Sequence, residues 1–173
     1  VWFNRDELNK TFSIAFKTIP SDDTGVFHIL EHSVLCGSKK YPVKEPFVEL
    51  LKGSLNTFLN AMTFPDKTVY PVSSRNDKDF MNLLDVYMDA VFTPRIYENP
   101  NIFYQEGWHY EIDENDKLNV VGVVHGEMTG AFSSVDEIKY ENILSMLYKD
   151  NTYSCCSGGN PKNIPDLTYK MFI

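Results

Sequence analysis

The chain has 173 residues, of which 43% are hydrophobic and 23% are charged, a composition typical of a globular domain with one apolar core. The net charge is −8, and the acidic residues are scattered along the chain. Because phosphate binding needs a basic face, this charge argues against nucleic acid as a partner. No stretch approaches the roughly 18 consecutive apolar residues of a membrane span, so we expect no membrane partner.

The first two predicted elements are a strand and a helix. Residues 12–16 alternate between large apolar side chains and small or polar ones, which is the period of a half-buried strand. A helix is expected from about Gly25 until Gly37, with Thr24 as its N-cap and Gly37 as the residue that ends it.

The middle of the chain predicts two strands followed by a long helix. The strand candidates are residues 57–63 and 68–73. Residues 76–92 place apolar side chains at helical spacing behind an Asn76 cap, and Pro94 follows to stop the helix.

The last third of the chain predicts one more strand and two helices around a loop. Residues 108–112 are the strand candidate. A Gly- and Pro-rich loop occupies residues 151–163, and Pro165 with Asp166 gives the start signal of a final helix. Before that loop, a capping box begins a helix with an apolar stripe; the box is Ser134 and Glu137, and the stripe is Tyr140, Ile143, Leu144, Leu147 and Tyr148.

The order of these elements indicates the fold class. Strands grouped in pairs between long helices, without regular alternation of strand and helix, predict an α+β domain in which an antiparallel sheet carries helices on one face. We expect a single domain over residues 1–173. The sequence opens without Met and the last helix signal is cut short at Ile173, so we expect an N-terminal fragment that is truncated at its C-terminal end.

Three polar residues share one face of the helix predicted at residues 25–37. At 3.6 residues per turn, His28 and His32 lie about 40° apart on the helix surface, and Glu31 lies about 60° to the other side of His28. Neutral imidazoles one turn apart can hold a zinc ion, and a carboxylate beside them can take a proton from a metal-activated water. The His-x-x-Glu-His order is the inverted zincin signature, so the sequence predicts two zinc ligands and a base.

The plainer interpretation of this motif is two unrelated structural histidines beside a solvated glutamate. The five-residue pattern arises by chance in roughly one chain in a few hundred of this length. A helix that is apolar on most sides is buried, and its polar groups then need partners. The flanking residues give the helix this apolar character; they are Phe27, Ile29, Leu30, Val34 and Leu35. A metal ion would partner both histidines, which favours the zinc site.

A catalytic zinc site usually takes a third protein ligand, which must come from elsewhere in the chain. Glu106 and Glu127 both lie in strongly apolar segments, where an unpaired carboxylate is costly to bury. His125 lies about 200° from Glu127 around a helix, so these two should not ligate together. Spacing alone does not decide among the candidates, which are Glu106, His109, His125, Glu127 and the cysteines Cys36, Cys155 and Cys156.

Several segments together resemble a known family. They are residues 28–38, Tyr41-Pro42, Glu45-Pro46-Phe47, residues 55–63, Tyr70-Pro71, residues 105–108 and residues 130–132. The chain resembles the presequence protease and falcilysin branch of the pitrilysin and insulinase zinc peptidases, and it looks most like a bacterial member. The likeness runs over nearly the whole chain.

The resemblance implies a role for each residue of the site. His28, His32 and Glu127 would bind Zn²⁺, Glu31 would be the general base, and Glu106 would be a supporting acid. The two residues before the third ligand depart from the family pattern. His125 and Gly126 stand where relatives carry an aromatic residue and Asn, and Gly126 removes a supporting donor from this place.

A further segment matches the family's substrate-binding edge. Asn60 and Ala61 correspond to residues to which the backbone of a bound peptide adds as an extra strand. The alternative is that residues 57–63 are simply a core strand.

The resemblance also implies a zinc endopeptidase that hydrolyses unstructured oligopeptides and is several times longer than this chain. Its partners are then peptide substrates and the remaining C-terminal domains of the same protein. Because a distant half supplies substrate contacts in the family, the chain alone is expected to be inactive or weakly active.

Two other functions stay open. S-ribosylhomocysteine lyases share an inverted His-x-x-Glu-His helix and a similar chain length, but their third ligand is a cysteine, for which Cys36 and Cys155 are poorly spaced. A non-catalytic homologue of the peptidase would keep the fold and lose the motif, whereas this chain retains both histidines and both candidate acids.

The cysteines indicate the compartment. Cys155 and Cys156 are adjacent, which disfavours an ordinary disulfide between them. A reducing compartment fits best, so we expect the cytoplasm, or an organelle matrix if the protein is eukaryotic. We expect Cys36 to be a small apolar side chain that fills space near the helix end. We expect no catalytic role for the loop that contains Cys155, Cys156, Gly158 and Gly159.

Overall fold

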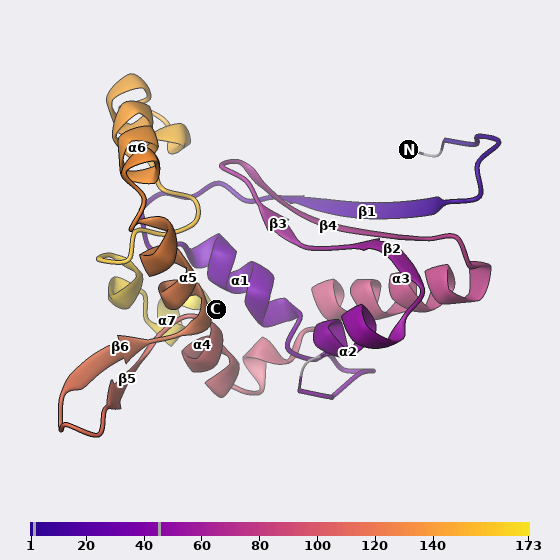
Figure 1. The fold of residues 1–173 in the computed structure, drawn as a ribbon, viewed down its shortest axis with the longest axis horizontal. Helices are drawn as coiled ribbons and strands as arrows, with labels where there is room; N and C mark the ends of the chain where they lie inside the picture. The colour runs from indigo at the N-terminus through magenta and orange to yellow at the C-terminus, as the bar shows by residue number, and fades with distance from the viewer. Residues whose placement is uncertain (2, 45) are drawn as a thin grey trace.

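The computed structural model describes residues 1, 3–44 and 46–173 (Figure 1). Glu45, one of the residues that carry the family resemblance, lies outside this described part. Within it, none of the helices has the length and apolar character needed to cross a membrane.

The central sheet has four antiparallel strands. β1 (Lys10–Lys17) pairs along its whole length with β4 (Lys67–Ser74), while β2 (Asn56–Leu59) and β3 (Met62–Thr63) pair with the other side of β4. The alternation predicted for β1 is confirmed, because its three large apolar side chains are half-buried and the residues between them are exposed. The sheet therefore has one apolar face to cover.

The strand expected over residues 57–63 is interrupted, so a single continuous strand was the wrong prediction. Asn60 and Ala61 separate β2 from β3. The Asn60 carbonyl accepts a hydrogen bond from the Tyr87 hydroxyl at 3.2 Å, and the Asn60 side chain accepts one from the Ala61 amide at 3.0 Å. In a continuous strand these backbone groups would instead form hydrogen bonds with neighbouring strands.

Three helices lie on one side of the strands (Figure 1): α1 (Val26–Val34), α2 (Pro46–Gly53) and α3 (Asp77–Phe92). As predicted, Asn76 caps α3, where its side chain accepts a hydrogen bond from the Asp79 amide at 3.0 Å. The core between these layers is formed by Val34, Leu59, Tyr70, Val72, Leu83 and Tyr87. The predicted α+β class, with helices packed on one face of an antiparallel sheet, is confirmed.

The ends of α1 differ from the prediction. Gly25, not Thr24, occupies the N-cap position, with a left-handed φ of 68° and no side-chain cap. Thr24 instead donates its hydroxyl to the Asp22 carboxylate at 2.6 Å. At the other end the helix stops at Val34, and Gly37, with a φ of 113°, lies in the turn beyond it. The two glycines are thus turn residues on either side of a shorter helix.

The second half of the chain surrounds a two-stranded hairpin, and its first strand confirms the strand expected at residues 108–112. In chain order, the elements are the 3₁₀ turn η1 (Arg95–Tyr97), α4 (Asn101–Glu106), the hairpin strands β5 (His109–Ile112) and β6 (Leu118–Val121), α5 (Val123–Ala131), α6 (Val135–Leu147), the 3₁₀ turns η2 (Thr152–Ser154) and η3 (Ile164–Asp166), and α7 (Tyr169–Phe172).

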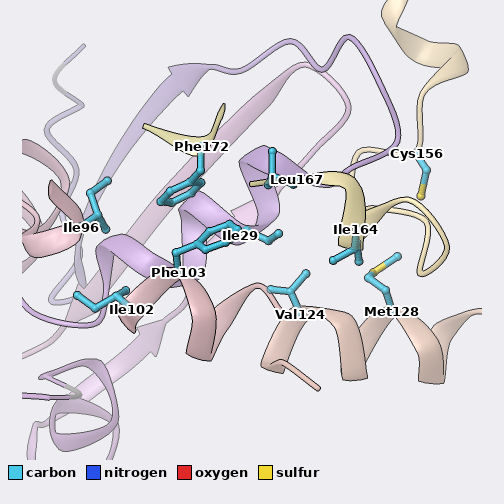
Figure 2. Packing of buried hydrophobic residues seen from close by; sticks show 10 residues of the cluster. All are labelled: Ile29, Ile96, Ile102, Phe103, Val124, Met128, Cys156, Ile164, Leu167 and Phe172. Atoms are coloured by element: carbon cyan, nitrogen blue, oxygen red, sulfur yellow. The ribbon is translucent and has the colours of Figure 1, made fainter. Parts of the chain in front are cut away.

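A second core joins α1 to this half of the chain (Figure 2). Ile29 of α1 is completely buried there, in one cluster with Phe103 of α4 and Val124 of α5. The other buried members are Ile96, Ile102, Met128, Cys156, Ile164, Leu167 and Phe172. This packing holds α4, α5 and the C-terminal segment against the helix that carries the His-x-x-Glu-His motif.

The two predicted C-terminal helices form with different ends and packing. Ser134 occupies the N-cap position of α6 without making a side-chain capping hydrogen bond, so the capping box is wrong. No residue of α6 is buried, and Tyr140 and Leu147 are more than half exposed, so most of the apolar stripe is exposed, although Tyr148 packs against Tyr153 of η2. The final helix signal yields η3 and then α7, which Thr168 caps.

Candidate metal centre

Helix α1 presents the three motif residues to one cavity. His28 and Glu31 are buried, at 9% and 7% exposure, and the His32 side chain is 24% exposed. The two imidazole rings stand one helical turn apart, with centroids separated by 5.0 Å. All three residues line a cavity of about 780 Å³ that also borders α4, α5 and the strand β3.

One ring nitrogen of His28 is engaged by the backbone. Its Nδ1 lies 2.9 Å from the carbonyl oxygen of Gly158. A carbonyl can only accept, so Nδ1 carries the proton and donates it. Nε2 therefore keeps its lone pair, and it lies 3.8 Å from Oε2 of Glu127. This tautomer suits metal ligation through Nε2.

The carboxylate of Glu106 engages Nδ1 of His32, as the Gly158 carbonyl engages Nδ1 of His28. Nδ1 of His32 lies 3.4 Å from Oε2 of Glu106, and Nε2 lies 3.6 Å from Oε2 of Glu127. Burial opposes a charge on His32, but the hydrogen bond to Glu106 and the nearby carboxylates of Glu31 and Glu127 outweigh it. The pKa of His32 is consequently raised above its ordinary value in the metal-free protein.

Glu106 ends helix α4 and is only 6% exposed. Its Oε1 accepts hydrogen bonds from the Gln105 amide at 2.9 Å and from the Cys36 thiol at 3.3 Å. Burial pushes the pKa of Glu106 up, but the bonds from His32, Cys36 and Gln105 outweigh burial and hold the pKa below its ordinary value. Glu106 thus stays ionised, and Cys36 is a donor to it as well as a filler.

The geometry distinguishes the two acidic candidates for the third ligand. Glu127 of α5 faces Nε2 of both histidines, whereas Glu106 faces Nδ1 of His32. One atom each of His28, His32 and Glu127 lie within 4.8 Å of one another. Within the described parts of the chain, no other histidine, acid or cysteine belongs to such a group.

The donor set of this group fits zinc. Metal bonds of about 2.0–2.1 Å at tetrahedral angles place neighbouring ligand atoms roughly 3.3 Å apart, and two imidazoles with one carboxylate leave a fourth position open. The separations of 3.6 and 3.8 Å between Glu127 and the histidines need only a small adjustment to reach that value.

At Gly126, the departure from the family pattern, a Cβ would meet nothing within 4 Å, so the missing side chain leaves open space.

Glu31 and the predicted substrate-binding residues line the same cavity. The Thr63 hydroxyl of β3 donates to Oε2 of Glu31 at 2.8 Å. Asn60 and Ala61 lie in the same wall, next to apolar side chains that include Phe64. The structure therefore brings Asn60 and Ala61 near the motif, and their contact with a substrate stays a prediction.

Two contacts of this site could not be found by reading the sequence. Thr63 lies 32 positions from Glu31, and Gly158 lies 130 positions from His28. The loop of Gly158 was interpreted as having no part in the site, and the structure places its carbonyl on a motif histidine. The only local signal was the Gly158-Gly159 pair, since paired glycines often mark a close backbone approach.

The cysteines have no place among the candidate ligands. Cys155 and Cys156 are free thiols. Burial raises the pKa of the Cys156 thiol to about 12, so it stays protonated at neutral pH. The Cys36 thiol donates a hydrogen bond to the Glu106 carboxylate.

The fold and the grouped side chains define a class, an α+β domain with an inverted metal-binding motif on a buried helix. The family model of Insulinase (Peptidase family M16) matches residues 20–144. The chain belongs to this family.

Relatives that are similar to the chain include a presequence protease. Protein HypA of Clostridium perfringens is 63% identical over 169 residues, which are 97% of this chain and 17% of that protein. Presequence protease 1, chloroplastic/mitochondrial, of Arabidopsis thaliana is 58% identical over 170 residues, which are 98% of this chain and 16% of that protein. The chain thus spans about a sixth of the length of these relatives.

A solved structure supports the fold. The crystal structure of pitrilysin matches with a TM-score of 0.65 at 20% identity, over 95% of this chain and 16% of that one. Together with the family match, this shared fold confirms the resemblance to the pitrilysin and insulinase peptidases.

Proposed function

We propose that this chain is the zinc-binding part of an endopeptidase that hydrolyses unstructured oligopeptides through a metal-activated water. The observation that carries the proposal is the group of His28, His32 and Glu127, with Glu31 lining the same cavity. The relatives named presequence proteases and the M16 family match support peptide hydrolysis as the reaction.

Each residue of the site has a role in this proposal. His28 and His32 bind the metal through Nε2, and Glu127 binds it through its carboxylate. Bound zinc supplies the Lewis acidity that activates water and polarises a peptide carbonyl. Glu31 takes the proton of the attacking water and passes it to the leaving amine. Glu106 orients His32 by accepting a hydrogen bond from its Nδ1–H group.

The substrate is proposed to bind as an extended chain along the Asn60–Ala61 segment. Backbone groups of this segment are already bonded locally, the Asn60 carbonyl to the Tyr87 hydroxyl and the Ala61 amide to the Asn60 side chain, and an added peptide strand would exchange the bond of the Ala61 amide for one of its own. A peptide that adds there by backbone hydrogen bonds is recognised by its extended shape more than by its side chains. Unstructured peptides are therefore the favoured substrate class.

We place the chain in a longer protein whose further domains complete the substrate site. Its share of about a sixth of the relatives' length supports this proposal. The test compares hydrolysis of an unstructured peptide by the complete protein and by this chain alone, both loaded with zinc. The complete protein should cleave and lose activity to a chelator, whereas comparable cleavage by the chain alone would contradict the need for further domains.

Thr63 gives a smaller, specific prediction for the complete protein. Thr63→Val removes the hydrogen bond to Glu31, and bonds to charged groups contribute about 1.5–3 kcal/mol, so kcat/KM should fall by roughly 10-fold or more. Thr63→Ser keeps the hydroxyl and is expected to retain most of the activity. Equal losses in the two variants would show that the hydroxyl has no part in positioning Glu31.

The S-ribosylhomocysteine lyase alternative gains no support from the geometry, because it needs a cysteine ligand and Glu127 occupies that place beside the two histidines. A non-catalytic homologue stays distinguishable by the hydrolysis test. We keep the proposed compartment, the cytoplasm or an organelle matrix, on the ground that Cys155 and Cys156 are free thiols.

A further inference from the structure

The loop of residues 152–160 is tied to the segment that leads into α1. Asp23 accepts two hydrogen bonds from this loop. Its carboxylate Oδ1 accepts a hydrogen bond from the Cys156 amide at 2.8 Å, and its carbonyl accepts one from the Asn160 amide at 2.8 Å. Because Gly158 lies between these two anchored residues, the position of its carbonyl depends on Asp23.

Gly25 allows the loop to come close. A Cβ at Gly25 would lie 2.8 Å from the Gly158 carbonyl oxygen and 2.8 Å from Cα of Gly159, distances that real side chains do not reach. The φ of 68° at Gly25 is also one that other residues adopt only with strain. A side chain here would push directly on the oxygen that accepts the Nδ1 proton of His28.

We infer that Asp23 and Gly25 are positioning residues for the metal ligand His28. They hold the Gly158 carbonyl where it fixes the imidazole in the Nδ1–H tautomer and directs Nε2 toward Glu127. This inference rests on the proposed metal site. His32 receives the corresponding support from the Glu106 side chain, whereas His28 receives it from a backbone carbonyl that a separate loop must bring into place.

The test measures the zinc affinity of the complete protein by competition with a chelator. Loss of the partner of a ligating imidazole typically weakens metal binding about 10- to 100-fold, so Asp23→Ala should bind zinc more weakly by a factor in that range. Asp23→Asn keeps an oxygen that accepts from the Cys156 amide and should restore affinity close to the wild type. Asp22→Ala is the matched control, since it removes an equal charge from the same turn, where the Asp22 carboxylate binds Thr24.

A second pair of variants separates positioning from general strain. Gly25 and Gly37 flank α1, both have positive φ, and a Cβ would lie 2.8 and 2.7 Å from a backbone oxygen, respectively. The oxygen near Gly37 belongs to Val43, whereas the oxygen near Gly25 belongs to Gly158, the hydrogen-bond partner of His28. Gly25→Ala and Gly37→Ala should both lower the midpoint of thermal unfolding, and only Gly25→Ala should weaken zinc binding.

Each outcome decides the inference. Wild-type zinc affinity in folded Asp23→Ala and Gly25→Ala would overturn it, and so would equal losses of affinity in the two control variants. If Gly25→Ala does not fold, the comparison of Asp23→Ala with Asp23→Asn decides alone. A wild-type protein that binds no stoichiometric zinc would contradict the proposed function instead.

Discussion

Replacing Glu31 with Gln is expected to reduce peptide hydrolysis by the complete protein at least roughly 10²-fold while zinc stays bound. The amide keeps the size of the side chain and an oxygen that accepts from the Thr63 hydroxyl, so the cavity should be unchanged. It lacks the basicity to take a proton from the attacking water. The loss should therefore appear in kcat, with the metal content of the variant equal to that of the wild type.

The control for this experiment is a glutamate outside the cavity. Glu111 is exposed on β5, and Glu111→Gln should hydrolyse the peptide like the wild type. Undiminished cleavage by Glu31→Gln would mean that another residue is the base.

Replacing His32 with Ala is expected to remove stoichiometric zinc. In the proposed site His32 supplies one of three ligand atoms, and its Nε2 lies 3.6 Å from the Glu127 carboxylate. Without it, His28 and Glu127 would be left as a two-ligand site, which is fewer than catalytic zinc sites use. Hydrolysis should be lost together with the metal, which elemental analysis of the purified protein measures.

A second histidine tests whether this loss is specific. His125 lies on α5, two residues before Glu127, and does not belong to the ligand group. His125→Ala should keep about one zinc per chain, as expected for a residue outside the coordination shell. Full zinc retention in His32→Ala would contradict the ligand assignment.

Elements of the fold that depend on local patterns could be predicted from the sequence. The alternation in β1 and the helical spacing with an Asn76 cap in α3 both act between near neighbours in the chain. The break at Asn60 could not be predicted, because it depends on the Tyr87 hydroxyl from a helix that packs beneath the sheet. The exposure of most of the apolar stripe of α6 has a similar origin, since amphipathic spacing does not tell which surface will cover it.

The site shows the same division. The placement of His28, Glu31 and His32 on one helix face follows from helical geometry. The choice between Glu106 and Glu127 depends on which ring nitrogen each carboxylate faces, and only the packing of α4 and α5 against α1 determines this. The hydrogen bond from His28 to the Gly158 carbonyl could not be predicted from side-chain types, because a backbone carbonyl is present at every residue.

Anomalous diffraction at the zinc absorption edge, from crystals of the complete protein, tests the proposed metal centre most directly. The proposed metal centre should give one strong peak at about 2.0–2.2 Å from Nε2 of His28, Nε2 of His32 and a carboxylate oxygen of Glu127. The Nδ1 atom of His28 should still donate to the Gly158 carbonyl in that structure. A peak held by other residues, or no peak in crystals of a protein that hydrolyses peptides, would contradict it.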